Sequence, residues 1–416
     1  MAAARERQDC RSVPKTEHPK TYGGLGVLIA GGGVAGLEAL LALRALAGDL
    51  VDLELLAPEP AFWYRPLAVA EPFDAGRVHH FELASIAESA AASFTLGQLA
   101  TVDADARILR TGQGAEIGYD ILVIACGAVP RPWLAGALTF RGPADSDAFR
   151  RLLAEADNGS VRSVAFTLPA GGIWPLPLYE LALLTATRLA GHDKHVEIAL
   201  VTPEPAPLSL FGEAASCAVR DLLREHGISL HTGRYPARYE AGILELAPDT
   251  TLAVERVVAL PRLEGPRIPG IPQDADGFIA TDLSGRVHGL ASVYAAGDIT
   301  QFPIKQGGIA AQQADAVAEV IAAQAGAAVQ PHRFQPVLRG LLLTGGAPRY
   351  LRSEPHGGQG DTSTVSDEPL WWPPGKIVGR YLAPFLASHG GFEIQPPADT
   401  TGMLEIEIDL PADNAT

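Results

Sequence analysis

Three glycines near the N-terminus have the spacing needed to bind phosphate. Gly31, Gly33 and Gly36 form the pattern G-x-G-x-x-G. In this pattern the first glycine permits a tight turn, the second lets the backbone approach a pyrophosphate, and the third lets a helix pack closely on a strand. The phosphate lies at the helix N-terminus, where unpaired N–H groups and the helix dipole favour negative charge. The pattern therefore predicts a dinucleotide site that includes the backbone of Val34 and Ala35.

The flanking segments predict the strands and the helix that must hold this turn. Residues 26–30 are an apolar run typical of a buried parallel strand, and an apolar helical pattern continues after the glycines to Leu46. A second apolar run, residues 51–56, predicts the next strand. We therefore expect a strand, a glycine turn, a helix and a second strand, which is the context that a dinucleotide site requires.

Two charged residues after the second strand are candidates for further contacts. An acidic residue that binds a ribose hydroxyl would normally follow this strand, but Ala57 stands there. Glu59 is the nearest substitute, whereas Glu54 lies inside the strand and is less able to reach a ribose. Arg65 could pair with the pyrophosphate, because guanidinium binds phosphate through two N–H groups. It could equally be a surface residue on a stiff loop.

The composition limits the class of protein and its partners. The 416 residues suffice for two or three domains, 47% of them are hydrophobic, and the formal charge of −16 argues against nucleic acid or an anionic membrane as a general partner. No run is long enough to span a membrane, and the N-terminal segment lacks the apolar core of a signal peptide. We expect a cytoplasmic protein with a disordered leader at residues 1–20. The three cysteines form no paired motif, and no metal site is predicted.

A strand signature gives the first family resemblance. Residues 119–128 are Y-D-I-L-V-I-A-C-G-A. They resemble the Y-D-x-L-V-I-A-T-G signature of flavoproteins with two dinucleotide-binding domains, a superfamily that includes pyridine nucleotide-disulfide reductases, type II NADH dehydrogenases and sulfide:quinone oxidoreductases. The resemblance implies that the first site holds FAD, with Ala125, Cys126 and Gly127 beside it. Cys126 occupies the threonine position, and we interpret it as a small buried side chain rather than a redox group.

A second signature carries the same resemblance. Residues 293–298 are V-Y-A-A-G-D and are similar to the second flavin fingerprint of the superfamily, in which the aspartate binds a ribityl hydroxyl of FAD. This implies FAD contacts from Gly297 and Asp298. A helix is predicted to follow as far as residue 323, and its N-terminus would stabilise negative charge on the reduced flavin. Three residues at its start complete the expected flavin contacts: Lys305, Gln306 and Gly307. Lys305 could instead be a solvated loop residue.

A second strand, turn and helix unit begins at residues 161–167. Relatives that use NAD(P)H carry a second glycine pattern at this point. Here only Gly171 and Gly172 remain, and prolines crowd the start of the helix predicted over residues 176–189, so the nicotinamide dinucleotide site is degraded. Glu204 follows the next strand, where it could select the ribose of NAD or be an ordinary strand-end carboxylate.

The same unit resembles sulfide:quinone oxidoreductases, but its substrate residues differ. Trp174 stands where the cysteine that handles sulfide would be, and no cysteine follows Asp298, so we do not expect sulfide as the substrate. Gln312 and Gln313 resemble part of the segment by which type II NADH dehydrogenases line their quinone pocket. As a polar helix face, the two glutamines would need no function.

The residues after Pro331 predict a small third unit whose aromatic and basic side chains allow two interpretations. They would suit peripheral contact with a membrane interface, or a buried contact between domains or between the two copies of a homodimer. We favour the buried contact. The residues concerned are Trp371, Trp372, Lys376, Arg380 and Tyr381.

The predicted fold is α/β, with two Rossmann-like dinucleotide-binding domains, the second inserted in the first, and a C-terminal interface domain. The expected boundaries are 21–144 and 266–330 for the FAD-binding domain, 145–265 for a degenerate NAD(P)-binding-like domain, and 331–416 for the interface domain. The resemblance implies an FAD-dependent oxidoreductase that passes electrons from NAD(P)H to a quinone or another small acceptor, with Lys305 and Glu180 as candidate catalytic residues. The alternatives are a flavin-bearing sensor or partner protein with an eroded nucleotide site, and a flavoenzyme reduced by a protein donor.

Overall fold

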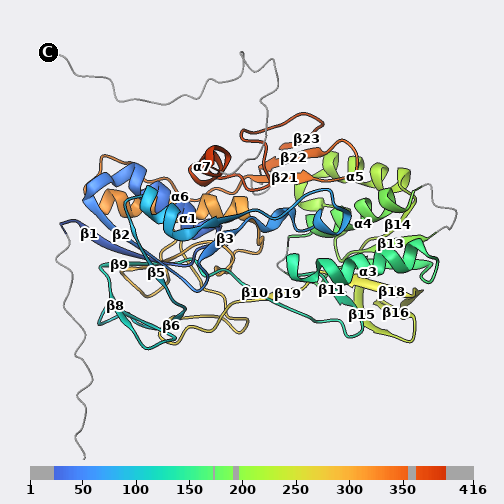
Figure 1. The fold of residues 1–416 in the computed structure, drawn as a ribbon, viewed down its shortest axis with the longest axis horizontal. Coiled ribbons are helices and arrows are strands. Elements are labelled where there is room, and N and C mark those ends of the chain that lie inside the picture. Colours follow the sequence, from blue (N-terminus) through green and yellow to red (C-terminus); the bar gives the residue numbers. More distant parts are fainter. Residues whose placement is uncertain (1–22, 172–173, 191–195, 355–361, 390–416) are drawn as a thin grey trace, which may run out of the picture.

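The computed structural model describes residues 23–171, 174–190, 196–354 and 362–389. The predicted leader, residues 1–20, and Gly172 lie outside the described residues. The chain forms two parallel sheets that lie at opposite ends of the long axis of the molecule, with a C-terminal antiparallel sheet along one side (Figure 1). The predicted class, a mixed α/β fold with parallel sheets, is confirmed.

The first sheet has five parallel strands in the order β20-β9-β1-β2-β5. The strands are β1 (Leu25–Ala30), β2 (Val51–Ala57), β5 (Ser93–Leu96), β9 (Ile121–Ile124) and β20 (Val293–Ala295). Strand β1 is buried along nearly its whole length, which explains why its sequence is a continuous apolar run rather than an alternation. The two strands predicted at 26–30 and 51–56 are therefore confirmed, each one residue longer than expected.

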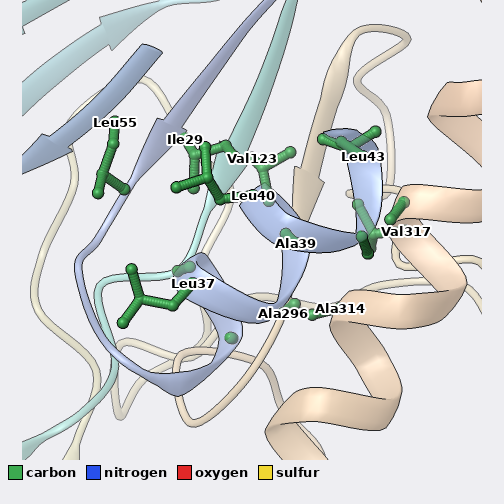
Figure 2. Close-up of a cluster of buried hydrophobic side chains, with 14 of the residues drawn as sticks. Ile29, Leu37, Ala39, Leu40, Leu43, Leu55, Val123, Ala296, Ala314 and Val317 are labelled. Atoms are coloured by element: carbon green, nitrogen blue, oxygen red, sulfur yellow. The ribbon is translucent and has the colours of Figure 1, made fainter. Parts of the chain in front are cut away.

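Two helices pack together against the first sheet, α1 (Val34–Ala47) and α6 (Gly307–Gln324). Leucines of α1 fill the space between the strands and α6, as Figure 2 shows. Helix α1 is apolar around most of its circumference because it contacts the sheet on one side and α6 on the other. Each fully buried leucine contributes about 1.5–3 kcal/mol relative to an exposed one. The side chains labelled in this core are Ile29, Leu37, Ala39, Leu40, Leu43, Leu55, Val123, Ala296, Ala314 and Val317.

The second sheet is also parallel and five-stranded, in the order β11-β18-β12-β13-β14. Its elements are β11 (Leu138–Thr139), α3 (Ser146–Asp157), β12 (Ser163–Thr167), α4 (Leu176–Leu189), β13 (Glu197–Val201), α5 (Glu213–Glu225), β14 (Ile228–His231) and β18 (Arg256–Ala259). All of its strands lie between β9 and β20 in the chain. The chain leaves and re-enters the first sheet through an antiparallel pair, β10 (Val129–Arg131) and β19 (Arg262–Glu264). The domain boundaries given above stay predictions.

The sequence of residues 94–102 predicts a single strand, and this prediction is wrong. The chain forms β5, which pairs with β2, and then β6 (Leu99–Asp103), which pairs with β7 (Ile108–Thr111) in a separate antiparallel sheet. The break falls at Gly97. Its N–H donates to the Ala57 carbonyl at 2.8 Å, which is the last hydrogen bond between this segment and β2. An apolar pattern does not show this change of partner.

The C-terminal residues form an antiparallel sheet of β21 (Leu338–Leu342), β22 (Arg349–Glu354) and β23 (Thr362–Ser366), followed by α7 (Leu382–His389). This sheet lies against α4 and α5, while α7 contacts α1 (Figure 1). Among the helices that the structure describes, none has the length and apolar character needed to cross a bilayer. The remaining strands and helix are β3 (Ala61–Trp63), β4 (His80–Glu82), α2 (Leu83–Ser89), β8 (Glu116–Gly118), β15 (Tyr235–Glu240), β16 (Ile243–Ala247) and β17 (Thr250–Ala253).

Candidate functional site

The glycine turn lies between β1 and α1, at the carboxyl edge of the first sheet. A Cβ atom added to Gly31 would lie 2.2 Å from the Ala125 carbonyl oxygen, and one added to Gly36 would lie 1.8 Å from the Gly31 carbonyl oxygen. Gly31 also has a φ of +136°, which side chains disfavour. These two glycines are therefore required by the close approach of backbone segments.

Gly33 differs from its two neighbours because it faces open space. It precedes the first residue of α1, and a Cβ atom added there would meet no atom within 4 Å. No side chain caps this helix end. A helix N-terminus with unpaired N–H groups and free space in front of it can accept an anion such as a pyrophosphate.

The second predicted fingerprint meets the glycine turn directly. A Cβ atom added to Gly297 would lie 3.0 Å from the Cβ of Ala35 and 3.4 Å from that of Ala310, so the turn after β20 packs on the first turn of α1. Gly307, at the start of α6, faces Val34, whose nearest methyl group would lie 3.6 Å from such a Cβ atom. The structure thus brings together the predicted contacts from residues 31–36 and 297–307, which are far apart in sequence.

Asp298 carries an unpaired carboxylate at this edge. Its side chain is half-buried, and it accepts no hydrogen bond from the residues that the structure describes. Desolvation raises the pKa of Asp298 to about 6, and the nearby charge of Lys305 opposes this increase. A partly desolvated carboxylate without a partner is suited to accept hydrogen bonds from hydroxyl groups of a ligand.

Lys305 is buried beside Asp298. Its Nζ donates to the Thr300 carbonyl oxygen and lies 3.8 Å from the centre of the Phe278 ring. Desolvation lowers the pKa of Lys305 to about 8, while the carboxylates of Asp298 and Asp274 act in the opposite direction. The interpretation of Lys305 as a solvated loop residue is therefore wrong, because only 7% of the residue is exposed.

The side chain of Gln306 caps the N-terminus of α6. Its Oε1 accepts from Ile309 N at 3.0 Å, and its Nε2 donates to the Arg339 carbonyl at 2.9 Å.

The two glutamines considered for a quinone pocket also form hydrogen bonds within the protein. Gln312 exchanges two hydrogen bonds with the backbone of Val337, and Gln313 accepts from Gly297 N at 2.7 Å. Gln313 therefore holds the turn that carries Asp298.

The remaining predicted contacts lie on loops of the same edge. Glu59 and Arg65 are exposed after β2, and neither forms an ion pair within the described residues. Glu54 is buried and accepts from Thr95 Oγ1 at 2.7 Å, in agreement with its exclusion as a ribose ligand.

The expectation of a buried Cys126 is wrong. Its side chain is exposed, because β9 ends at Ile124 and Cys126 lies two residues beyond the sheet. The adjacent Ala125 is buried, and Gly127 adopts a positive φ of +70° in the turn that follows. Although the residue as a whole is exposed, its sulfur is desolvated by the surrounding protein, which raises the pKa of the thiol to about 12, and a protonated thiol is a poor nucleophile.

Glu180, the second catalytic candidate, lies in a buried ion pair. Only 1% of the residue is exposed, its carboxylate pairs with Lys376 Nζ, and it accepts from Leu343 N at 2.9 Å. Burial raises the pKa of Glu180 and lowers that of Lys376. Glu180 is therefore closed off from solvent. Lys376 makes the kind of buried contact between units that we favoured over a membrane interface. Trp372 and Arg380 are exposed.

Sequence inspection missed a second group of buried carboxylates. Glu38 on α1 is fully buried and accepts from Tyr381 N at 2.7 Å and Leu382 N at 2.8 Å, so it caps the start of α7. Asp315 on α6 interacts with it, and desolvation together with the charge of Glu38 raises the pKa of Asp315 to about 8. The signal was available: Glu38 is the single acidic residue in a helix that is apolar apart from it and Arg44.

The geometry of this edge fits FAD. The open N-terminus of α1 suits the pyrophosphate, the unpaired Asp298 suits a ribityl hydroxyl, and the start of α6 lies next to both. Two parallel sheets with such an edge are typical of the class of dinucleotide-binding α/β proteins. The roles of the individual residues stay predictions.

The family described as pyridine nucleotide-disulphide oxidoreductase matches residues 178–318. This match supports the pyridine nucleotide-disulphide oxidoreductase superfamily, whose members bind FAD, and it is consistent with an enzyme. A NADH dehydrogenase-like protein of Mycobacterium tuberculosis (strain ATCC 25618 / H37Rv) is 28% identical over 293 residues, which are 66% of this chain and 72% of the relative.

Two solved structures share the fold. The sulfide:quinone oxidoreductase of the hyperthermophilic bacterium Aquifex aeolicus has a TM-score of 0.73 at 18% identity, over 83% of this chain and 87% of that one. A ferredoxin reductase from Rhodopseudomonas palustris has a TM-score of 0.59 at 21% identity, over 79% of this chain and 82% of that one.

Proposed function

We propose that this enzyme takes electrons from a reduced nicotinamide or another small donor and passes them through FAD to a quinone or another small acceptor. The observation that carries the proposal is the meeting of Gly33, Asp298 and the start of α6 at one open edge. FAD supplies the redox chemistry when it is bound, and the protein supplies binding, orientation and charge.

The electrostatics of the edge suit a site that accepts electrons. The N-terminus of α6 carries the positive end of the helix dipole, and Lys305 adds a buried ammonium group close to it. With a pKa of about 8, Lys305 holds a proton on Nζ in most molecules at neutral pH. Both groups stabilise negative charge that develops beside them, which favours the reduced state of a bound acceptor of electrons.

The comparisons support the choice of donor and acceptor. The curated relative is described as NADH dehydrogenase-like, and the Aquifex aeolicus structure is a sulfide:quinone oxidoreductase. We propose a nicotinamide donor and a quinone acceptor on this basis, with sulfide excluded because Trp174 occupies the position expected for a cysteine. The fold shared with a ferredoxin reductase supports the alternative of a protein partner. The cytoplasmic location stays a prediction.

The proposal is tested by anaerobic mixing of the flavin-loaded enzyme with NADH, followed by turnover with a soluble quinone. We expect the flavin absorbance to bleach and the quinone to restore it. Lys305→Met should keep the flavin but slow its reduction by about tenfold or more, because a stabilising charge is lost. Arg110→Met, at an exposed pair with Glu116, is the matched control and should behave like the wild type. A flavin that no donor reduces, or a Lys305→Met variant of unchanged rate, would contradict the proposal.

A further inference from the structure

We infer that the second parallel sheet binds no dinucleotide, because the chain's own C-terminal sheet lies over the edge where one would bind, and that a nicotinamide donor is recognised without its adenosine half. The inference rests on the proposed function for its second part. In doubly wound sheets the ligand lies outside the carboxyl ends of the strands, against the N-termini of the helices that follow. In the second sheet these are the N-termini of α4 and α5.

The N-terminus of α4 cannot present a row of N–H groups. Pro175 is the N-cap and Pro177 is the second helical residue, so neither has an N–H group to offer. The N–H of Leu178 donates to the Pro175 carbonyl at 2.9 Å. Leu176 itself is 3% exposed. A pyrophosphate would find neither the donors nor the access that it finds at Gly33.

The C-terminal sheet covers both helix starts. A Cβ atom added to Gly340 on β21 would lie 2.7 Å from the Phe211 ring and 3.5 Å from Leu176 Cδ2, so β21 packs directly on the first residue of α4. At α5, the N–H of Ala215, in the first turn, donates to Ser363 Oγ of β23 at 3.3 Å. The chain therefore occupies the places where the phosphates and the ribose of a dinucleotide would lie.

The acidic residue expected to bind the ribose is also engaged. Tyr179 Oη and Thr202 Oγ1 donate to Glu204 Oε2 at 2.7 and 2.9 Å, while the other carboxylate oxygen, Oε1, is buried without a hydrogen-bond partner among the described residues and is closed off from solvent. The Tyr179 hydroxyl in turn accepts from Leu208 N at 3.3 Å. These bonds join the loop after β13 to α4, so Glu204 serves the structure rather than a ligand.

The cover is part of the core and not a lid. Three leucines of the C-terminal sheet belong to the same buried cluster as Leu176 and Phe211. The buried Glu180 and Lys376 pair fastens α4 to the C-terminal segment, and Tyr64 Oη accepts from Lys376 N at 2.9 Å, which ties that segment to the first unit as well. Opening the edge would expose an apolar cluster and separate a buried ion pair. The three leucines are Leu338, Leu342 and Leu351.

The test compares donors with and without the adenosine half on the flavin-loaded enzyme. Because the described residues of the second unit leave no place for the adenosine half of a donor, reduced nicotinamide mononucleotide should reduce the flavin within about threefold of the rate constant of NADH, and NADPH should match NADH. Equilibrium dialysis of ADP-ribose at about 1 mM should show no binding. The variant Glu204→Gln should leave both results unchanged.

The outcomes separate this inference from the proposed function. If NADH is more than about tenfold better than the mononucleotide, or if ADP-ribose binds and Glu204→Gln weakens it, the inference is overturned while the flavin enzyme stands. If neither nicotinamide reduces the flavin and ADP-ribose does not bind, the closed second edge is supported and the nicotinamide donor is rejected. If the protein does not bind FAD at all, the proposed function is contradicted. If that protein also fails to bind ADP-ribose, the absence of a dinucleotide site on the second sheet is still supported.

Discussion

The two parallel sheets have the same number of strands, but the carboxyl edge of the first is open and that of the second is covered. At the first edge, Gly33 faces open space and Asp298 has no partner among the described residues. At the second edge, the corresponding helix start has two prolines and Glu204 accepts hydrogen bonds from two side chains. One fold thus serves as a ligand site in one copy and as a support for the C-terminal sheet in the other. The difference lies in whether the helix start faces open space, as at Gly33, or is covered by the C-terminal sheet, as at Leu176.

The largest expected effect comes from breaking the cover of the second edge. Lys376→Met leaves the Glu180 carboxylate buried without its cation, which should lower the free energy of unfolding by about 3–5 kcal/mol. Urea unfolding followed by circular dichroism measures this change. Arg110→Met removes an exposed pair and should cost about 0–1 kcal/mol. If the two variants lose the same small amount, the buried pair does not hold the C-terminal segment.

The open edge can be tested with two glycines that differ in their surroundings. Gly36→Ala forces a Cβ atom toward the Gly31 carbonyl and should destabilise the protein by about 1–3 kcal/mol or more. Gly33→Ala meets no atom and should leave the stability of the apoprotein unchanged, yet weaken FAD by about tenfold, because the new methyl group lies where the pyrophosphate approaches. Flavin titration and thermal unfolding are measured together. Equal FAD affinity in Gly33→Ala and the wild type would show that the pyrophosphate does not lie at Gly33.

Gln313→Leu should disturb the turn that presents Asp298. The change leaves the buried Gly297 N–H without its acceptor, at a cost of about 1–3 kcal/mol. We expect weaker FAD binding in addition, because Asp298 follows Gly297 directly. Gln312→Leu is the matched control on the neighbouring position, since its amide contacts Val337 and not the turn. A larger loss of FAD affinity in Gln312→Leu than in Gln313→Leu would contradict this role.

The smallest effect concerns pH. The pKa of Asp315 is raised to about 8 in the folded protein, so between pH 4 and 8 the folded state keeps a proton that the unfolded chain loses. The free energy of unfolding should therefore decrease as the pH rises through this window. Asp315→Asn should flatten this dependence and stabilise the protein at pH 8 relative to the wild type, because the amide takes up no proton in either state. An unchanged pH profile in the variant would show that Asp315 is not the proton carrier.

Much of the fold could be predicted from local sequence patterns, but the covering of the second sheet's carboxyl edge could not. The apolar runs and glycine spacing predicted β1, β2, α1 and α4, since each signal lies within one short segment. The sequence around Gly171 also showed that the second glycine pattern is degraded. It could not show that Gly340 and Ser363, more than a hundred residues later, pack on that site, because the contact depends on how distant segments meet. The burial of Lys305 and the exposure of Cys126 depend on tertiary packing for the same reason.

Titration of the flavin-free protein with FAD, and then of the FAD-loaded protein with ADP-ribose, tests the central claim most directly, because it counts the sites that hold an adenosine diphosphate. The account predicts about one tightly bound FAD per chain and no saturable ADP-ribose site once FAD is in place. A chain that binds no FAD, or one that binds ADP-ribose while FAD is in place, would contradict it.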